Sequence, residues 1–173
     1  YDGGANKGKI SWGKRGADEI VGNKVLSENV WYFLTVTRTG GINYIYVDGV
    51  LDNSGATADF NVLAHDLHIG GNDNVGGYYF KGTIDEVRVY NRALSAGEIA
   101  NHYEKGAGGK SVKINTSGLA TTTINSPLNN YWLNGLVGFW SFNGPDMDFS
   151  KNQATDRSVN SNHGTLISMS TTT

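Results

Sequence analysis

Cysteine is absent from the 173 residues of this chain. Its absence excludes a disulfide framework, a thiolate metal site and a cysteine nucleophile, and it fits an exported protein. Proline is scarce, with two residues, whereas glycine occurs 24 times. This balance favours an all-β protein with many turns.

An excess of charge of one sign is also lacking. The 14 basic and 16 acidic residues give a net charge of −2, and they are spread along the chain. Such a chain has no basic surface to attract nucleic acid or an anionic membrane. The sequence has no apolar run of the length that spans a bilayer. We therefore expect no nucleic-acid partner and no membrane insertion.

Short alternating segments separated by glycine turns fill the first part of the chain. Residues 31–38 are rich in aromatic and β-branched side chains and predict a strand. Gly40 and Gly41 turn the chain into a second strand over residues 42–47. Asp48-Gly49 then supplies a hairpin turn that needs positive φ angles. With a shorter strand expected at residues 67–71, this spacing indicates a β-sandwich.

A strand and a helix follow each other closely after residue 82. Residues 84–90 alternate in the manner of a strand. Ser95 and Glu98 have the spacing of a capping box, which predicts a helix over residues 96–104. This stretch resembles the closing strand and short helix of bacterial laminin G-like domains, members of the concanavalin A-like lectin/glucanase group. The resemblance implies an antiparallel concanavalin A-like β-sandwich (jelly roll) with one short helix, incomplete or permuted.

A second signature stands near the other end of the chain. Residues 135–144, GLVGFWSFNG, and residues 156–166, DRSVNSNHGTL, resemble the opening of the same kind of domain. The signature that resembles the end of a domain therefore comes before the signature that resembles the beginning of one. We expect residues 1–106 to be the C-terminal portion of one laminin G-like domain, 107–134 a linker rich in Thr, Ser and Asn, and 135–173 the opening strands of a domain. A tandem array, a permuted domain and a strand-exchanging subunit would each produce this order, and we expect a segment of a longer protein.

The strand expected at residues 136–142 needs a partner for its backbone donors and acceptors. It can return to its own sandwich, because the linker is long enough. It can also insert into the next molecule, which would be self-association by strand exchange. We favour pairing within the chain, because a tethered partner has the higher effective concentration.

Oxygen-bearing groups recur at every second position of the loop that follows the opening strand. They are Asp156, Ser158, Asn160, Asn162 and Gly164. Such a loop can wrap a hard cation, and Ca²⁺ takes six to eight oxygens. The resemblance implies a structural calcium near this loop and near Asp85 of the closing strand. The sequence departs from the family pattern at Val159 and Ser161, where glycines are usual. The alternative is a polar loop whose side chains bond their own backbone.

A second loop combines amides and aromatic rings. It contains Asn72, Asp73, Asn74, Tyr78 and Tyr79. Carbohydrate sites pair flat aromatic faces with hydrogen-bonding side chains, and binding residues concentrate on loops. We therefore expect these residues to contact a carbohydrate or a surface glycoconjugate. The alternative places aromatic rings between the sheets, which we expect of Trp12 and of one ring in each tyrosine pair.

Catalysis finds little support in the sequence. Glycoside hydrolysis needs two carboxylates on either side of one bond, but Asp85 and Glu86 are adjacent and would point to opposite faces of a strand. Asp146 and Asp148 form a second acidic pair that alternation would aim the same way, which would raise the local affinity for a cation, but we favour a solvated turn after Pro145. We predict a non-catalytic, extracellular or cell-surface module for adhesion or carbohydrate binding. The alternatives are a structural spacer or fibre-forming module and an accessory domain of a secreted glycosidase.

Overall fold

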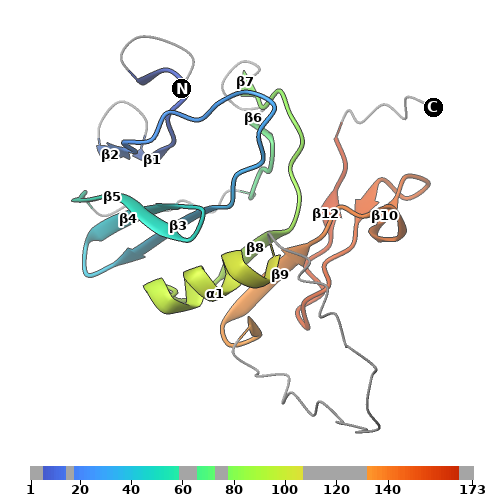
Figure 1. The fold of residues 1–173 in the computed structure, drawn as a ribbon. Coiled ribbons are helices and arrows are strands. Elements are labelled where there is room, and N and C mark those ends of the chain that lie inside the picture. The colour runs from blue at the N-terminus through green and yellow to red at the C-terminus, as the bar shows by residue number, and fades with distance from the viewer. Residues whose placement is uncertain (1–5, 15–17, 59–65, 73–77, 107–131, 168–173) are drawn as a thin grey trace, which may run out of the picture. The chain divides into compact units, whose positions relative to one another are not determined.

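The computed structural model describes residues 6–14, 18–58, 66–72, 78–106 and 132–167 (Figure 1). The chain forms two compact units that alternate along the sequence. The first combines residues 1–63 with 93–122, and the second combines residues 64–92 with 123–173. The expected repeat boundaries at residues 106 and 134 stay a prediction.

In its described residues the first unit contains five strands and a helix. They are β1 (Ser11–Lys14), β2 (Asp18–Val21), β3 (Leu34–Thr39), β4 (Ile42–Val47), β5 (Val50–Ala56) and α1 (Ala96–Gly106). Strands β1 and β2 form an antiparallel hairpin, and β3, β4 and β5 form an antiparallel sheet in that order. The core joins these two sheets, because Ile20 of β2 packs with Ile45 and Val47 of β4. The two β4 residues are two positions apart and so share one face of the strand.

The turn between β4 and β5 has the predicted geometry. Asp48 has a φ of 54° and Gly49 a φ of 79°, the two positive values of a type I′ turn. Helix α1 approaches this turn closely, since a Cβ on Gly49 would lie 3.0 Å from Cβ of Tyr103. The predicted capping box is also present. The Ser95 N–H donates to the Glu98 carboxylate at 2.7 Å, and the Glu98 N–H donates to Ser95 Oγ at 3.3 Å.

The second unit consists of short strands. They are β6 (Gly71–Asn72), β7 (Tyr78–Tyr79), β8 (Val87–Tyr90), β9 (Leu136–Trp140), β10 (Met147–Asp148), β11 (Gln153–Ala154) and β12 (Gly164–Thr165), with a 3₁₀ helix η4 (Gly144–Asp146) before β10. They pair antiparallel as β6 with β7, β8 with β9, and β10-β11-β12. The strand of the opening-type signature, β9, pairs with β8 of the same chain, and the preference for this pairing over strand exchange between molecules stays a prediction.

The strands are shorter than predicted at three places. The strand expected at residues 31–38 begins at Leu34 and leaves Trp31 65% exposed. The strand expected at residues 84–90 begins at Val87, because Glu86 has a φ of 55° and breaks the extended backbone. The segment 67–71 enters a strand only at Gly71.

The aromatic side chains also depart from prediction in part. Trp12, expected between the sheets, is 38% exposed, whereas Tyr46 is buried as one member of its tyrosine pair. In the described part of the chain α1 is the one α-helix, and no helix there has the length and apolar character needed to cross a membrane. The predicted all-β structure with one short helix is confirmed.

Candidate functional site

The loop after the opening-type strand is fastened by a buried carboxylate. Asp156 is 5% exposed and accepts four hydrogen bonds. Its Oδ1 accepts the N–H groups of Phe139 and Ser158, each at 2.8 Å. Its Oδ2 accepts Ser158 Oγ at 2.7 Å and the Asn162 N–H at 2.8 Å. Burial raises the pKa of Asp156, but these donors outweigh it and hold the pKa below its ordinary value.

The same loop covers the edge of β9 that does not pair with β8. The amide nitrogens of Asn160 and Asn162 donate to carbonyl groups of β9, the latter to Val137 at 2.8 Å. The Arg157 N–H donates to the carbonyl of Phe139 at 2.8 Å. The loop therefore takes the place of a neighbouring strand, which keeps this edge from pairing with another chain.

Four of the residues predicted to bind calcium lie together in this loop, but the loop bonds to itself. A carboxylate has about four lone-pair sites, and at Asp156 all four accept donors from the chain. Gly164 pairs with Ala154 in the β10-β11-β12 sheet, and the exposed Asp85 accepts the N–H of Glu86 at 2.8 Å. The described residues include no group of three His, Asp or Glu side chains that could hold a metal. As arranged, these residues do not fit a cation with six to eight oxygen ligands. Calcium binding here stays a prediction of the sequence.

A second buried carboxylate was not predicted. Asp146, expected in a solvated turn, is 7% exposed. It accepts the Ser141 hydroxyl and, at 3.0 Å, the Arg157 guanidinium, while its backbone carbonyl accepts the Thr155 N–H at 2.8 Å. The partners lie 5 to 11 residues away in sequence, so no local pattern could have revealed the burial. This cluster stabilises the unit rather than exposing a reactive group.

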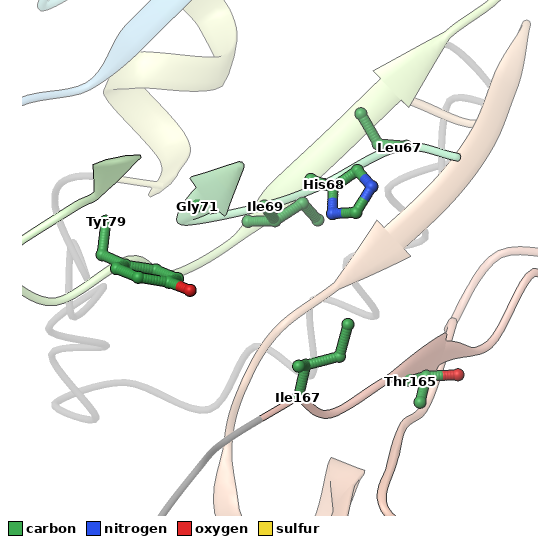
Figure 2. A pocket seen from close by; sticks show the side chains of 7 residues that line it. All are labelled: Leu67, His68, Ile69, Gly71, Tyr79, Thr165 and Ile167. Atoms are coloured by element: carbon green, nitrogen blue, oxygen red, sulfur yellow. The ribbon is translucent and has the colours of Figure 1, made fainter. Parts of the chain in front are cut away.

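A pocket of about 120 Å³ opens beside strands β6 and β7 in the second unit. It is lined by Leu67, His68, Ile69, Gly71, Tyr79, Thr165 and Ile167. Figure 2 shows the segment from Leu67 to Gly71 on one side, Thr165 and Ile167 on another, and the Tyr79 ring at one end. The pocket thus joins two parts of the sequence that are about ninety residues apart.

One residue of the predicted carbohydrate loop lines this pocket. Tyr79 is 63% exposed. Asp73 and Asn74 lie outside the described residues, as do the side chains of Asn72 and Tyr78. The other lining residues were missed, because Leu67 and Ile69 were interpreted as an ordinary strand and residues 165–167 as the end of a family signature.

The pocket lining combines polar and apolar groups. Leu67, Ile69 and Ile167 supply aliphatic side chains, whereas His68, Thr165 and the Tyr79 hydroxyl supply hydrogen-bonding groups. The described lining contains no carboxylate. This arrangement offers contact area and hydrogen-bonding groups to a small ligand.

Comparison with known proteins identifies a family for residues 1–100 of the chain. A family model for laminin G-like domains, described as the concanavalin A-like lectin/glucanases superfamily, matches residues 1–100. The chain belongs to this family. Its predicted membership is therefore confirmed, and the mostly-β structure with a single short helix fits the predicted β-sandwich class. The match ends before residue 135, so the interpretation of residues 135–166 as an opening signature stays a prediction.

One solved structure is similar to part of the laminin G-like chain. It is residues 221–444 of an S-layer domain-containing protein from Clostridium thermocellum, with 26% sequence identity and a TM-score of 0.41. The similarity covers 55% of this chain and 50% of that chain, so the chain spans about half of that structure's length. None of the curated proteins matches the chain.

Proposed function

We propose that this chain is a non-catalytic, extracellular binding module whose ligand is a carbohydrate or a surface glycoconjugate. The observation that carries the proposal is the Tyr79 ring, which is 63% exposed at the edge of a pocket. Membership in the concanavalin A-like lectin/glucanases superfamily supports it.

The physical reason lies in the surface of a sugar ring. A pyranose has an apolar face of C–H groups and a periphery of hydroxyl groups. An aromatic ring buries the apolar face, and polar side chains beside it accept or donate to the hydroxyls. Tyr79 supplies the ring, and His68 and Thr165 supply polar groups in the same pocket.

The proposal assigns no hydrolysis to this pocket. A glycosidase needs an acid and a second carboxylate, about 5–10 Å apart, on either side of the scissile bond. The described lining provides neither. An extracellular location agrees with membership in the concanavalin A-like lectin/glucanases superfamily.

A glycan array probed with the intact chain tests the proposal, followed by calorimetric titration of the sugars that bind. We expect Tyr79→Ala to weaken binding about tenfold, which corresponds to about 1.4 kcal/mol. The matched control is Trp31→Ala, which removes an aromatic side chain of similar exposure, 65%, from outside the pocket. Affinity should be unchanged in that control.

Two results would contradict the proposal. An array without binding, obtained with folded protein, would favour a structural spacer or fibre-forming module instead. Binding that Trp31→Ala weakens and Tyr79→Ala does not would place the site elsewhere on the chain.

A further inference from the structure

We infer that the outer edge of strand β3 binds an extended segment of another polypeptide, which adds an antiparallel strand to the β3-β4-β5 sheet. This inference goes beyond the proposed function, because it assigns a protein-binding surface to the first unit. Three features support it: the direction of the backbone groups of β3, the lack of protection at this edge, and the side chains that an added strand would meet.

Alternate residues of β3 direct their backbone groups away from β4. Asp48 donates its N–H to the carbonyl of Phe33 at 2.8 Å, so Phe33 and, by alternation, Thr35 bond towards β4. The N–H and C=O groups of Leu34 and Val36 therefore point outward. Strand β3 is at the edge of its sheet, and no hydrogen bond to these four groups is found within the described part of the chain.

Two other strand edges are covered, whereas β3 is not. The 156–162 loop bonds to the outer edge of β9, and the Asn53 amide of β5 donates to the carbonyl of Val21 in β2 at 2.8 Å. Proteins protect exposed edges with proline, lysine, bulges or a covering loop. The six residues of β3, LTVTRT, include no proline, lysine or carboxylate, and their pairing with β4 has no bulge. Such an edge is a template for another strand.

The side chains of β3 define the chemistry of the added strand. Leu34, Val36 and Arg38 share one face of β3, and Leu34 is 43% exposed. Arg38 adds a positive charge to this face, where its guanidinium donates to Asn43 Oδ1 at 2.9 Å. Residues directly opposite each other in an antiparallel pair interact on the same face. The segment that fits has aliphatic side chains opposite Leu34 and Val36 and a carboxylate opposite Arg38.

A second copy of β3 fits this edge less well. When two β3 strands pair antiparallel with Val36 opposite Val36, each Leu34 lies opposite an Arg38, so that an aliphatic side chain faces a charged one. The two-fold symmetry of such a pair repeats this mismatch at both ends. The partner is therefore a different polypeptide, and the isolated chain stays a monomer.

The probe is a synthetic peptide, acetyl-Thr-Glu-Thr-Val-Thr-Ile-Thr-amide. Antiparallel to β3, it places glutamate opposite Arg38, valine opposite Val36 and isoleucine opposite Leu34. Amide hydrogen exchange on the intact chain, measured by NMR, follows its binding. We expect the N–H groups of Leu34 and Val36 to exchange rapidly in the free chain and to become protected in the complex. The N–H of Thr35, which bonds towards β4, should be protected in both states.

Two matched pairs locate the binding. N-methylation of the peptide's valine and isoleucine blocks amides that face β3 and should weaken binding about tenfold. N-methylation of the two threonines beside the valine blocks amides that face away and should leave the affinity unchanged. In the protein, Leu34→Lys should weaken binding about tenfold. The control is Val50→Lys, because Val50 is 69% exposed and also lies opposite Val47, but on the other edge strand.

Three results would overturn the inference. The first is a peptide that does not bind, or that both patterns of N-methylation weaken equally. The second is binding that Leu34→Lys leaves intact. The third is protection of Leu34 and Val36 that rises with protein concentration in the absence of peptide, which would identify a second copy as the partner. None of these results decides the proposed sugar binding, which is tested separately at Tyr79 in the second unit.

Discussion

Replacing Asp156 by alanine should unfasten the 156–162 loop from strand β9. The carboxylate accepts four hydrogen bonds, and its own exposure is 5%. All four bonds are part-buried, and a bond to a charged group contributes about 1.5–3 kcal/mol. Their contributions do not add in full, because water can reach the donors of the exposed Asn162 once the carboxylate is gone. We expect a loss of about 3 kcal/mol in the free energy of unfolding.

Urea unfolding, followed by tryptophan fluorescence, measures this loss. With an m-value of about 1–3 kcal/mol/M, the midpoint should fall by about 1–3 M. The control is Asp85→Ala, because Asp85 is exposed and its carboxylate accepts the N–H of the adjacent Glu86. That variant should change the free energy of unfolding by less than about 0.5 kcal/mol. An Asp156→Ala loss as small as that of the control would refute the reasoning.

Acid should remove the same contribution. The donors around Asp156 hold its pKa below the ordinary value in the folded protein, whereas an unfolded aspartate has a pKa of about 3.9. The stabilisation is therefore complete above the unfolded value and is lost as the pH falls through the folded pKa. Asp156→Asn does not titrate, so the difference in unfolding free energy between parent and variant should shrink below about pH 3.9. A difference that is constant from pH 7 to pH 2 would contradict this.

Melting curves in calcium and in chelator distinguish the two interpretations of the 156–164 loop, a calcium site and a loop that bonds to itself. The self-bonded loop predicts the same melting midpoint in calcium and in chelator, since no lone pair of Asp156 is left for a cation. A midpoint that calcium raises in the parent, and that Asp156→Ala makes insensitive to calcium, would instead support the calcium prediction of the sequence.

Two further substitutions and a measurement of molecular mass test the fold. Gly138→Ala should lower the free energy of unfolding in urea by about 1–3 kcal/mol, because its Cβ would lie 2.7 Å from Cζ3 of the Trp140 ring. The control is Gly144→Ala, whose Cβ meets nothing within 4 Å, and this variant should leave the free energy of unfolding unchanged. Ser95→Ala removes the helix cap and should cost about 1 kcal/mol by thermal unfolding, with the exposed Ser27→Ala as its control. Light scattering should find a monomer at all concentrations, because β8 and β9 pair within one chain. Oligomers that grow with concentration would show strand exchange between chains.

Local features of this fold were predictable because neighbouring residues determine them. The Asp48-Gly49 turn follows from two residues that tolerate positive φ, and the helix start from a serine and a glutamate three residues apart. The family was also recognisable from short motifs. Each of these signals lies within about twenty residues.

The candidate site was less predictable because its parts meet only in the folded chain. Glu86 lies in an alternating pattern that predicts a strand, and nothing in that pattern signals its positive φ. Asp146 was expected in a solvated turn, yet its side chain is buried and accepts hydrogen bonds from Ser141 and Arg157. Of the pocket lining, only Tyr79 was marked in advance, because aliphatic residues at strand positions are normally part of a core.

The loop and the pocket are connected through the strand between them. Thr165 belongs to β12, which pairs with β11 and begins at Gly164, two residues after Asn162, where the Asp156 hydrogen bonds end. Two pocket residues, Thr165 and Ile167, therefore depend on a segment whose position Asp156 fixes. Binding residues need a rigid scaffold to stay in place, because a small displacement loses contacts. The Asp156 carboxylate therefore positions pocket residues through the backbone that it anchors, although Asp156 itself does not line the pocket. The four hydrogen bonds to this one side chain therefore have a structural consequence for the pocket, independent of any metal.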